Sequence, residues 1–469
     1  MAQTDWLHAG VGRVDITPAP GTPQGGWGAQ THERGIAADM PMYATALALG
    51  HGQEYVLILD VDAIGFNAEW TGKIVAAVAA TTGLPHDRIR FSCSHTHAGP
   101  NTFRLDNISA GREMAESYLA ALPQRIAGAA WSALQQMVPV RAAADVNESR
   151  INRKRRVKTQ SDEVVVGVDE GAQADHQVGV VRLDDEGGRA VAVIVHYACH
   201  PTTCGWQNEY FSPDYPGPMR ATVEREVGGL CVFLQGTAGD LGPRKGFTGD
   251  RAVYRHLGHE LGLAAAATAY AIETRREVAM FDHVMPSGAN IAVYHYEELQ
   301  RQKPVLKMLS RDVMLPTGNF DAEELIAQKL QSLRDEVQQL REAGDLQAMR
   351  RAQADATQTN WKLENVRAYG KVWETAWPMQ AIRIGDLALL SIAGEPFSSI
   401  GLAIKAASPF AHTFVSGYSN GGFGYIPDEK AYAEGGYEVA ATPFSHDAAA
   451  VVIREGLAML QELFQNERT

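Results

Sequence analysis

The sequence is poor in cysteine, carries more acidic than basic residues, and lacks a long apolar run. Its 469 residues include four cysteines at irregular spacing: Cys93, Cys199, Cys204 and Cys231. That spacing favours reduced thiols over a disulfide framework. A net charge of −13 offers no basic face to a nucleic acid or an anionic lipid, and no apolar run is long enough to span a membrane. We therefore expect neither a nucleic-acid nor a membrane partner.

The remaining composition is that of a globular protein, with 45% hydrophobic and 21% charged residues. The first eight residues contain neither the basic nor the apolar region of a signal peptide. We therefore expect a cytoplasmic protein.

A histidine pair follows one of the predicted strands. The apolar run 88–91 predicts a strand, and Gly99-Pro100 turns the chain after it. In extended backbone, residues two apart point the same way, so His95 and His97 would face one pocket. Two imidazoles among small residues suit a divalent metal, although the pair alone is equally compatible with ordinary loop histidines.

Further candidate ligands appear where other apolar strands end. His200 follows the strand predicted over 190–197, and Glu395 follows the strand over 387–392. Tyr425 lies in a fourth loop. Two imidazoles, a carboxylate and one more oxygen make a zinc site with a position left for water.

A glycine-rich turn, residues 236–243, follows the strand over 230–235 and contains Gly239, Asp240 and Gly242. Its backbone amides can approach a ligand closely, so these three residues are candidate substrate contacts. Asp60 and Asp62, at the end of the strand over 55–62, either orient a metal ligand or cap the next helix.

The order of strands and helices predicts an α/β fold, with a mixed sheet covered by helices. The run over 55–62 is apolar almost throughout, which is typical of a strand buried on both faces. Helices are expected over 68–82, 111–137, 218–226, 251–273 and 446–463.

Residues 299–370 differ in character. Apolar side chains recur there at steps of four and three, from Ile326 to Leu340, and Gly344-Asp345 interrupts the pattern. This predicts a helical hairpin inserted into a discontinuous α/β domain made of residues 1–298 and 371–469. We expect a structural role or a homo-oligomer contact for the hairpin, and favour these over a lid.

The one basic cluster spans residues 149–156. It is either a solvated loop or the source of an arginine that points into the site and holds an oxygen anion or a carbonyl.

At these residues the sequence resembles the neutral/alkaline ceramidase family. The matching pieces are His-Thr-His-Ala-Gly-Pro at 95–100, His200-Pro-Thr, Gly-Thr-Ala-Gly-Asp at 236–240, Gly-Glu395-Pro, and Gly-Tyr-Ile-Pro-Asp-Glu at 424–429 with Tyr432. Arg153, in Ile-Asn-Arg, is similar to the family's substrate-facing arginine. The pieces follow the family's order over the catalytic domain.

The resemblance implies a ceramidase-like catalytic fold and a zinc amidohydrolase with one Zn²⁺ per chain. It implies that His95, His200, Glu395 and Tyr425 bind the zinc. His97 would form hydrogen bonds or transfer protons, and Arg153 would hold the scissile carbonyl.

Two departures from the family pattern matter. Gly242 stands where the family has a serine proposed as catalytic, so attack by zinc-bound water is favoured. We also expect no counterpart of the immunoglobulin-like domain that ends the long ceramidases, because the catalytic pieces and the hairpin take up these 469 residues. We therefore expect a small, water-soluble amide as substrate.

The predicted function is hydrolysis of a C–N amide bond in a small N-acyl compound. Zinc-bound water would attack the carbonyl, His97 and Arg153 would stabilise the oxyanion, and His97 would protonate the leaving amine. The same ligands also suit an esterase or lactonase. A non-catalytic zinc-containing binding protein is the further alternative, although structural zinc sites are usually rich in cysteine. A binuclear amidohydrolase barrel fits less well, because its His-x-His lies on the first strand.

Overall fold

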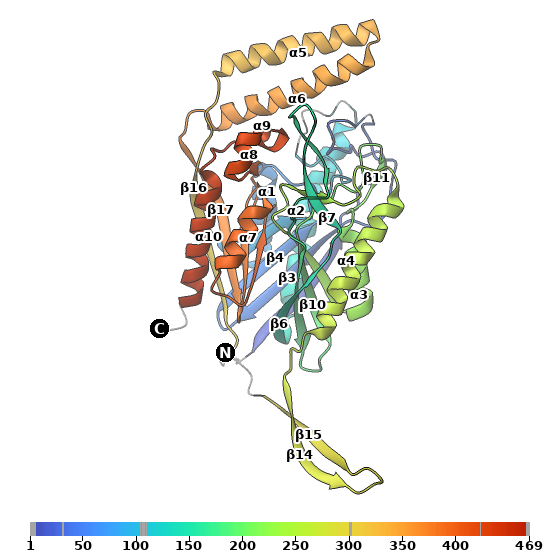
Figure 1. Cartoon of the computed structure of the whole chain (residues 1–469), viewed down its shortest axis with the longest axis vertical. Coiled ribbons are helices and arrows are strands. Elements are labelled where there is room, and N and C mark those ends of the chain that lie inside the picture. The colour runs from blue at the N-terminus through green and yellow to red at the C-terminus, as the bar shows by residue number, and fades with distance from the viewer. Residues whose placement is uncertain are drawn as a thin grey trace.

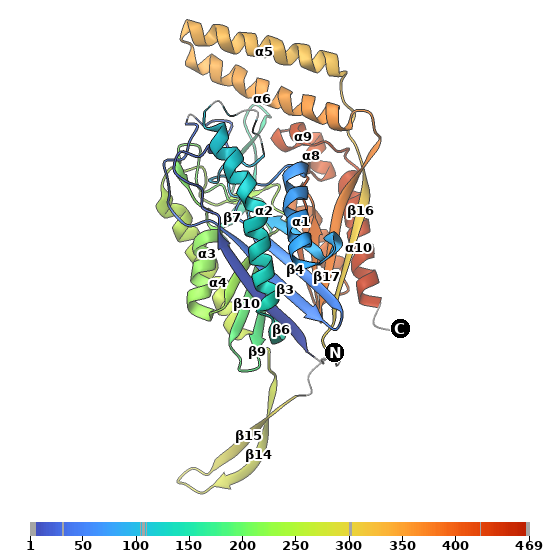
Figure 2. The same cartoon turned by 180° about the vertical axis from the view of Figure 1, so that it is seen from behind.

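The computed structural model describes residues 6–30, 32–103, 105, 108, 110–299, 303–422 and 424–465. These residues form four layers, with two β-sheets packed face to face and helices on the outer face of each sheet (Figures 1 and 2).

The larger sheet has eight strands in the order β12-β10-β9-β6-β1-β3-β4-β5. Its strands are β1 (Leu7–Asp15), β3 (Tyr43–His51), β4 (Glu54–Val61), β5 (Ile89–Cys93), β6 (Val138–Glu148), β9 (Gln177–Asp185), β10 (Ala190–Tyr197) and β12 (Leu230–Gln235). The pairs β4–β5 and β10–β12 are parallel, and all other neighbours are antiparallel.

The smaller sheet has the order β16-β17-β18-β20. Its strands are β16 (Leu306–Pro316), β17 (Glu374–Ile384), β18 (Leu387–Ile392) and β20 (His412–Ser416). The two sheets share one core, in which Val56 and Ile58 of β4 pack with Leu389 and Phe414. Leu57 and Leu59 point to the opposite face, so β4 is buried on both faces, as its apolar run predicts.

Helices cover both outer faces. On the larger sheet, α1 (Ala68–Thr82) and α2 (Arg112–Gln135) cover one half, and α3 (Pro216–Val227) and α4 (Arg251–Ala271) cover the other. On the smaller sheet lie α7 (Ser398–Ala407) and α10 (Ala448–Gln465). The structure confirms the predicted mixed α/β fold and divides the predicted sheet in two.

The larger sheet curls until its edge strands β5 and β12 approach each other. Residues 416–419, which continue from β20, bridge to both edges through the pairs Ser92–Ser419 and Gly236–Ser416. The chain segments that leave β5, β10, β12, β18 and β20 therefore reach one place. Four short strands near that place, β13 (Leu241–Pro243), β7 (Asn152–Lys158), β19 (Glu395–Pro396) and β21 (Tyr425–Ile426), complete the surroundings of the site.

Short elements fill the remaining connections. They are β2 (Ala37–Ala38), η1 (His86–Arg88), β8 (Val164–Asp169), β11 (Tyr210–Phe211), α8 (Glu429–Glu434) and α9 (Tyr437–Ala441). β8 pairs with β7, and β11 pairs with β2.

Two hairpins extend from opposite ends of the body (Figures 1 and 2). The helical hairpin is α5 (Glu323–Ala343) and α6 (Leu346–Tyr369), and Gly344 and Asp345 cap its two helices at the turn. The predicted range 299–370 also takes in β16, which belongs to the smaller sheet. The second hairpin, β14 (Glu277–Met285) and β15 (Ile291–Glu298), was not predicted. In the described residues, every helix is too short or too polar to cross a bilayer.

Candidate metal centre

Three histidine side chains meet where strands of the larger sheet end. The Nε2 of His95 lies 3.1 Å from that of His200 and 3.4 Å from that of His97. Ligand atoms of all three lie within 4.8 Å of one another. His95 and His200 are buried and His97 is nearly so. Three imidazoles this close together could hold a metal ion.

Backbone carbonyls fix the orientation of each ring. The Nδ1 atoms of His95, His97 and His200 donate hydrogen bonds to the carbonyls of Ile64 (2.5 Å), Gly26 (2.8 Å) and Ala238 (2.9 Å). Because Nδ1 carries the proton, the lone pair of every Nε2 points into the cluster. This arrangement is typical of histidines that bind metals.

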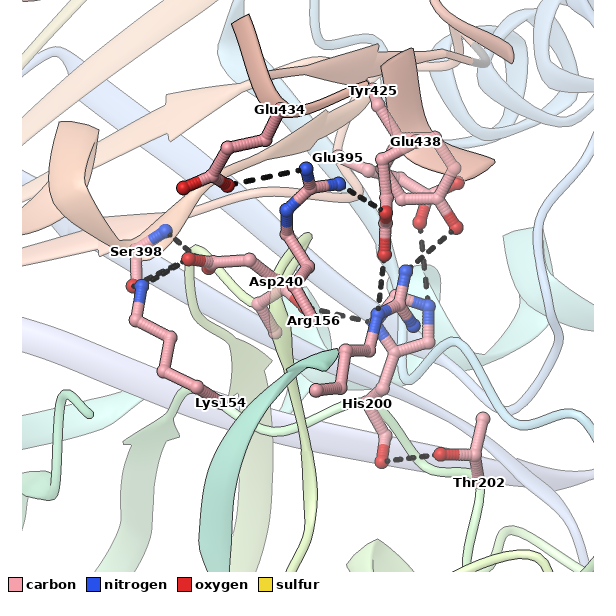
Figure 3. Close-up of polar contacts among 12 residues, drawn as sticks. Lys154, Arg156, His200, Thr202, Asp240, Glu395, Ser398, Tyr425, Glu434 and Glu438 are labelled. Carbon is pink, nitrogen blue, oxygen red and sulfur yellow. Dashed lines mark hydrogen bonds and ion pairs between the residues drawn. The ribbon is translucent and has the colours of Figure 1, made fainter. Parts of the chain in front are cut away.

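Glu395 supplies an anionic oxygen to the same cluster. Its Oε2 lies 3.3 Å from His200 Nε2 and 3.6 Å from His95 Nε2, and Figure 3 shows the carboxylate directed at His200. This buried oxygen accepts no hydrogen bond from the part of the chain that the structure describes. A buried carboxylate oxygen without a donor, beside imidazole nitrogens, fits a divalent cation bound among them.

Burial keeps the histidines neutral. Desolvation is the largest cause of a lowered pKa at each, well below the usual value for His95 and His200 and to about 4 for His97. For His200 the nearby positive charge of Arg155 lowers the pKa further. Neutral imidazoles are the form that can bind a metal.

The backbone turns sharply at the first histidine. β5 ends at Cys93, and His95 has a left-handed φ of 67°. Its amide donates to Ala63 O at 2.9 Å, which holds this turn against the end of β4. The prediction that His95 and His97 lie on continuous extended backbone was therefore wrong. Their rings nevertheless converge, as predicted. A non-glycine residue with positive φ is often found at a functional site.

Tyr425 approaches the cluster from β21, which pairs with β19 in a separate two-stranded sheet. β19 and β21 pair so that Glu395 and Tyr425 stand in register. The phenolic oxygen accepts a hydrogen bond of 3.0 Å from Nη2 of Arg155. Burial, followed by the charge of Glu395, raises the pKa of Tyr425 well above its usual value. The structure thus brings together the four residues predicted to bind zinc, with His97 beside them.

The arginine of the site is Arg155, whereas the sequence pointed to Arg153. The guanidinium of Arg153 pairs with Glu170 at 2.8 Å and also donates to backbone carbonyls. Arg155 is buried and reaches Tyr425. The register of β7 against β8 shifts between Lys154 and Arg156, so simple strand alternation does not describe this segment.

Glu438 of α9 holds this arginine. It is 1% exposed, accepts from Arg155 Nε at 3.1 Å, and accepts from Arg156 at 2.6 Å. Figure 3 shows Arg156 between Glu438 and Glu434. The sequence analysis did not predict a role for Glu438. The only local feature that could have drawn attention to it is the pair Tyr437-Glu438 after Gly436.

The glycine-rich turn supports the site from behind. Asp240 accepts hydrogen bonds from Lys154 and from the amide and hydroxyl of Ser398 (Figure 3). A Cβ on Gly239 would lie 2.5 Å from Glu395 O, and Gly242 pairs with Arg153 across β7 and β13. The predicted substrate contacts Gly239, Asp240 and Gly242 are therefore corrected. None of the three lines the pocket: Gly239 lies against the backbone of Glu395, and Asp240 joins Lys154 to Ser398.

Two other residues differ from expectation. Asp60 and Asp62 neither cap a helix nor touch the histidines, since both pair with the buried Arg220 of α3.

Tyr418, which the sequence gave no reason to choose, places its hydroxyl 3.2 Å from His200 Nδ1 and its ring 4.3 Å from that of His95.

A pocket of about 760 Å³ opens over the cluster. His95, His97, Glu395 and Tyr425 line its base, and His200 is buried against His95 and Glu395. We call these five residues the floor. Residues of α5 and α6 line its far side, and we call these the roof: Leu330, Arg334, Val337, Gln338, Arg341, Gln353, Ala356, Thr357, Asn360, Trp361, Glu364 and Asn365. The helical hairpin thus covers the pocket, the role that the sequence favoured least.

The structure is similar to solved ceramidases. One is the neutral ceramidase from Pseudomonas aeruginosa, with a TM-score of 0.69, 19% identity, and coverage of 97% of this chain and 75% of the other. Another is described as a ceramidase complexed with C2, with a TM-score of 0.68, 18% identity, and coverage of 98% and 76%. The chain has the fold of a neutral ceramidase.

This finding confirms the resemblance at the level of the fold. No protein-family profile matches the sequence, and no curated protein matches it.

Proposed function

We propose that the protein is a zinc-dependent amidohydrolase that cleaves the C–N bond of a small, soluble N-acyl compound. The observation that carries this proposal is the convergence of three neutral imidazoles and an unpartnered carboxylate oxygen at the floor of a pocket. Support also comes from the ceramidase fold, because the solved proteins that share it are named for cleaving ceramide.

His95, His200 and Glu395 would hold the ion. Their three ligand atoms lie within 3.6 Å of one another, and His97 and Tyr425 border the open side. When bound, zinc lowers the pKa of a water molecule and polarises a carbonyl. A neutral set of nitrogen ligands with one carboxylate is a common catalytic zinc environment.

Tyr425 is placed to bind the carbonyl oxygen of the substrate. Its oxygen already accepts from Arg155, so its own proton is free to donate into the pocket that it lines. Its raised pKa keeps the phenol protonated. As the carbonyl oxygen gains charge, this hydrogen bond strengthens, which favours the transition state. Arg155 positions the hydroxyl and adds positive charge.

His97 is placed to move a proton. Its Nδ1 proton is held by Gly26 O, so Nε2 can accept a proton from the attacking water. The same nitrogen can then return that proton to the leaving amine as the C–N bond breaks. A pKa lowered to about 4 keeps His97 unprotonated before the reaction.

The side chains of the roof favour a polar substrate. Most of its side chains are polar or charged, and the exposed Arg334 and Arg341 stand at α5 beside Gln338. A long hydrocarbon chain would desolvate these groups without a compensating contact. A short acyl group, or one with polar substituents, would keep them hydrated or hydrogen-bonded.

The test is amine release from a panel of N-acyl amides, with matched esters and lactones, before chelation, after chelation and after zinc is restored. We expect cleavage of amides that is lost on chelation and recovered with zinc. Cleavage confined to esters or lactones would keep the metal centre and overturn the proposed bond. Amide cleavage that is unchanged in the chelated protein would overturn the role of the metal.

A further inference from the structure

Two exposed arginines of the roof, Arg334 and Arg341, line the pocket from α5. They lie about two helical turns apart, and Leu330 and Val337 alternate with them along the same face of the helix. Neither guanidinium forms a salt bridge or a hydrogen bond with the residues that the structure describes. Both groups can therefore donate hydrogen bonds to a molecule in the pocket.

The acidic residues beside these arginines in the sequence lie off that face. Asp335, Glu336 and Glu342 are exposed but do not line the pocket. The whole chain has a net charge of −13, so acidic residues are more common than basic ones. On α5, however, the arginines lie toward the pocket and their acidic neighbours lie away from it. This separation of charge favours an anionic group in the pocket.

Acidic side chains also line the pocket, but they are already engaged. Glu33 and Glu364 both interact with other residues, and Glu364 accepts a hydrogen bond of 2.6 Å from Nδ2 of Asn360. Glu395 belongs to the floor, where the charge of the proposed zinc ion would more than offset its own. The arginines of α5 are therefore the groups of the lining that could hold a charged part of a ligand.

A row of aromatic rings leads from the floor to the roof. The ring of Tyr437 lies 5.4 Å from that of Tyr425, and the ring of Trp361 on α6 lies 5.4 Å from that of Tyr437. All three residues line the pocket. Aromatic rings suit an apolar chain that packs along them. A ligand with its carbonyl at Tyr425 can therefore extend along these rings toward the roof.

We propose that the substrate carries an anionic oxygen group, a carboxylate or a phosphate, several bonds from the scissile amide, and that Arg334 and Arg341 bind it. This inference rests on the proposed amide hydrolysis and names the class of substrate for the same pocket. A guanidinium presents a planar fork of donors that matches both anionic groups. At a site partly open to water, such contacts should tighten binding about 10-fold.

The test uses ketone analogues in which a methylene replaces the amide nitrogen, so that binding is measured without hydrolysis. The first is the analogue of N-butyryl-6-aminohexanoate, which ends in a carboxylate. The second ends in a phosphate monoester, and the third ends in a neutral carboxamide. Calorimetry on the zinc-loaded full chain should give a Kd about 10-fold lower for an anionic analogue than for the carboxamide. The tighter of the two anionic analogues identifies the group.

The double variant Arg334→Gln, Arg341→Gln keeps polar side chains but removes both charges. We expect the ratio of Kd values between the neutral and the anionic analogue to fall to about twofold or less. The matched control is Arg350→Gln, Arg351→Gln, which removes two exposed arginines of α6 that do not line the pocket. Its ratio should equal that of the natural protein, and unchanged thermal unfolding should show that each variant folds.

Equal Kd values for the charged and neutral analogues in the natural protein would overturn the inference. So would a preference that survives in Arg334→Gln, Arg341→Gln, or one that is lost in the control. Amine release from the corresponding amides separates this inference from the proposed function. Amide cleavage without an anionic preference would overturn this inference alone, whereas an anionic preference without cleavage of any amide would keep the anion site and overturn the proposed function.

Discussion

The floor and the roof of the pocket are built in opposite ways. Floor side chains are buried or nearly buried at strand ends, where backbone carbonyls orient the three imidazoles and Arg155 donates a hydrogen bond to Tyr425. The roof stands on two helices whose own core is small, with Ile326, Leu330 and Leu363 as its buried members. A rigid floor suits chemistry, which tolerates little misplacement, whereas an exposed roof suits recognition of the rest of the substrate.

The largest effect should follow removal of a floor ligand. His200→Ala or Glu395→Ala should lose the metal and, with it, several kcal/mol of transition-state stabilisation, on the order of 10³-fold in kcat/KM. His256→Ala, at a histidine with a 71% exposed side chain outside the site, is the matched control. Metal content and amine release should be measured on the same samples. A metal-free His200→Ala protein with full activity would contradict the account.

Lowering the pH should decrease the free energy of unfolding through a buried histidine beside the floor. His196 lies on β10, the strand that leads to His200, and burial lowers its pKa to about 4. The unfolded chain, with a pKa of about 6.5, then binds more protons than the folded one, so stability falls as the pH drops from 6.5 toward 4. The loss is about 1.4 kcal/mol per pH unit for this group, up to about 3 kcal/mol.

The free energy of unfolding should be followed against pH in the natural protein and in His196→Gln. Glutamine can still donate to Val415 O, the acceptor of the His196 ring, but does not titrate. We expect the variant to lose less stability between pH 6.5 and 4. If the free energy of unfolding falls equally with pH in the two proteins, His196 does not cause the loss of stability in acid.

Arg155 should matter for turnover and Arg153 should not. Arg155→Ala removes the donor that orients the Tyr425 hydroxyl, and we expect kcat to fall about 10- to 100-fold with metal content unchanged. Arg153→Ala removes a partly exposed pair with Glu170 and should leave kcat within about twofold. A larger loss of kcat in Arg153→Ala than in Arg155→Ala would show that Arg153, and not Arg155, assists turnover.

The roof should affect binding, with a small effect on the chemical step. The ring of Trp361 on α6 lies 5.4 Å from that of Tyr437, which in turn lies 5.4 Å from Tyr425. Trp361 lines the pocket, so Trp361→Ala removes one aromatic surface that a substrate can contact, worth about 0.5–1.5 kcal/mol, and should raise KM about 2- to 10-fold with kcat nearly unchanged. Trp373→Ala, at a tryptophan that is 85% exposed outside the pocket, should change neither constant. A fall in kcat alone would show that the roof orders the floor.

Most of the floor could be predicted from the sequence, because every floor residue except Tyr425 follows an apolar strand that ends in a turn. His95, His97, His200 and Glu395 were all chosen on that basis, and the structure brings them together. The curl of the larger sheet, which places the ends of β5 and β10 in one site, has no local signal, because it depends on the contact of two edge strands.

Other features depended on tertiary packing in the same way. The resemblance implied Arg153, and the register shift in β7, which the sequence does not reveal, accompanies the burial of Arg155 at the site. Asp240 accepts a hydrogen bond from Lys154, a residue far away in the sequence. The period of α5 and α6 predicted a helical hairpin, yet periodicity cannot say what the hairpin covers. The hairpin β14–β15 was not predicted, because strands that pack on no core show no consistent alternation.

The most direct test of the central claim is anomalous diffraction from crystals of the zinc-loaded protein, collected on either side of the zinc absorption edge. The account predicts one peak per chain among the Nε2 atoms of His95 and His200 and the carboxylate of Glu395, and no peak there in crystals of His200→Ala. A strong zinc peak elsewhere, with none among these three residues, would contradict it.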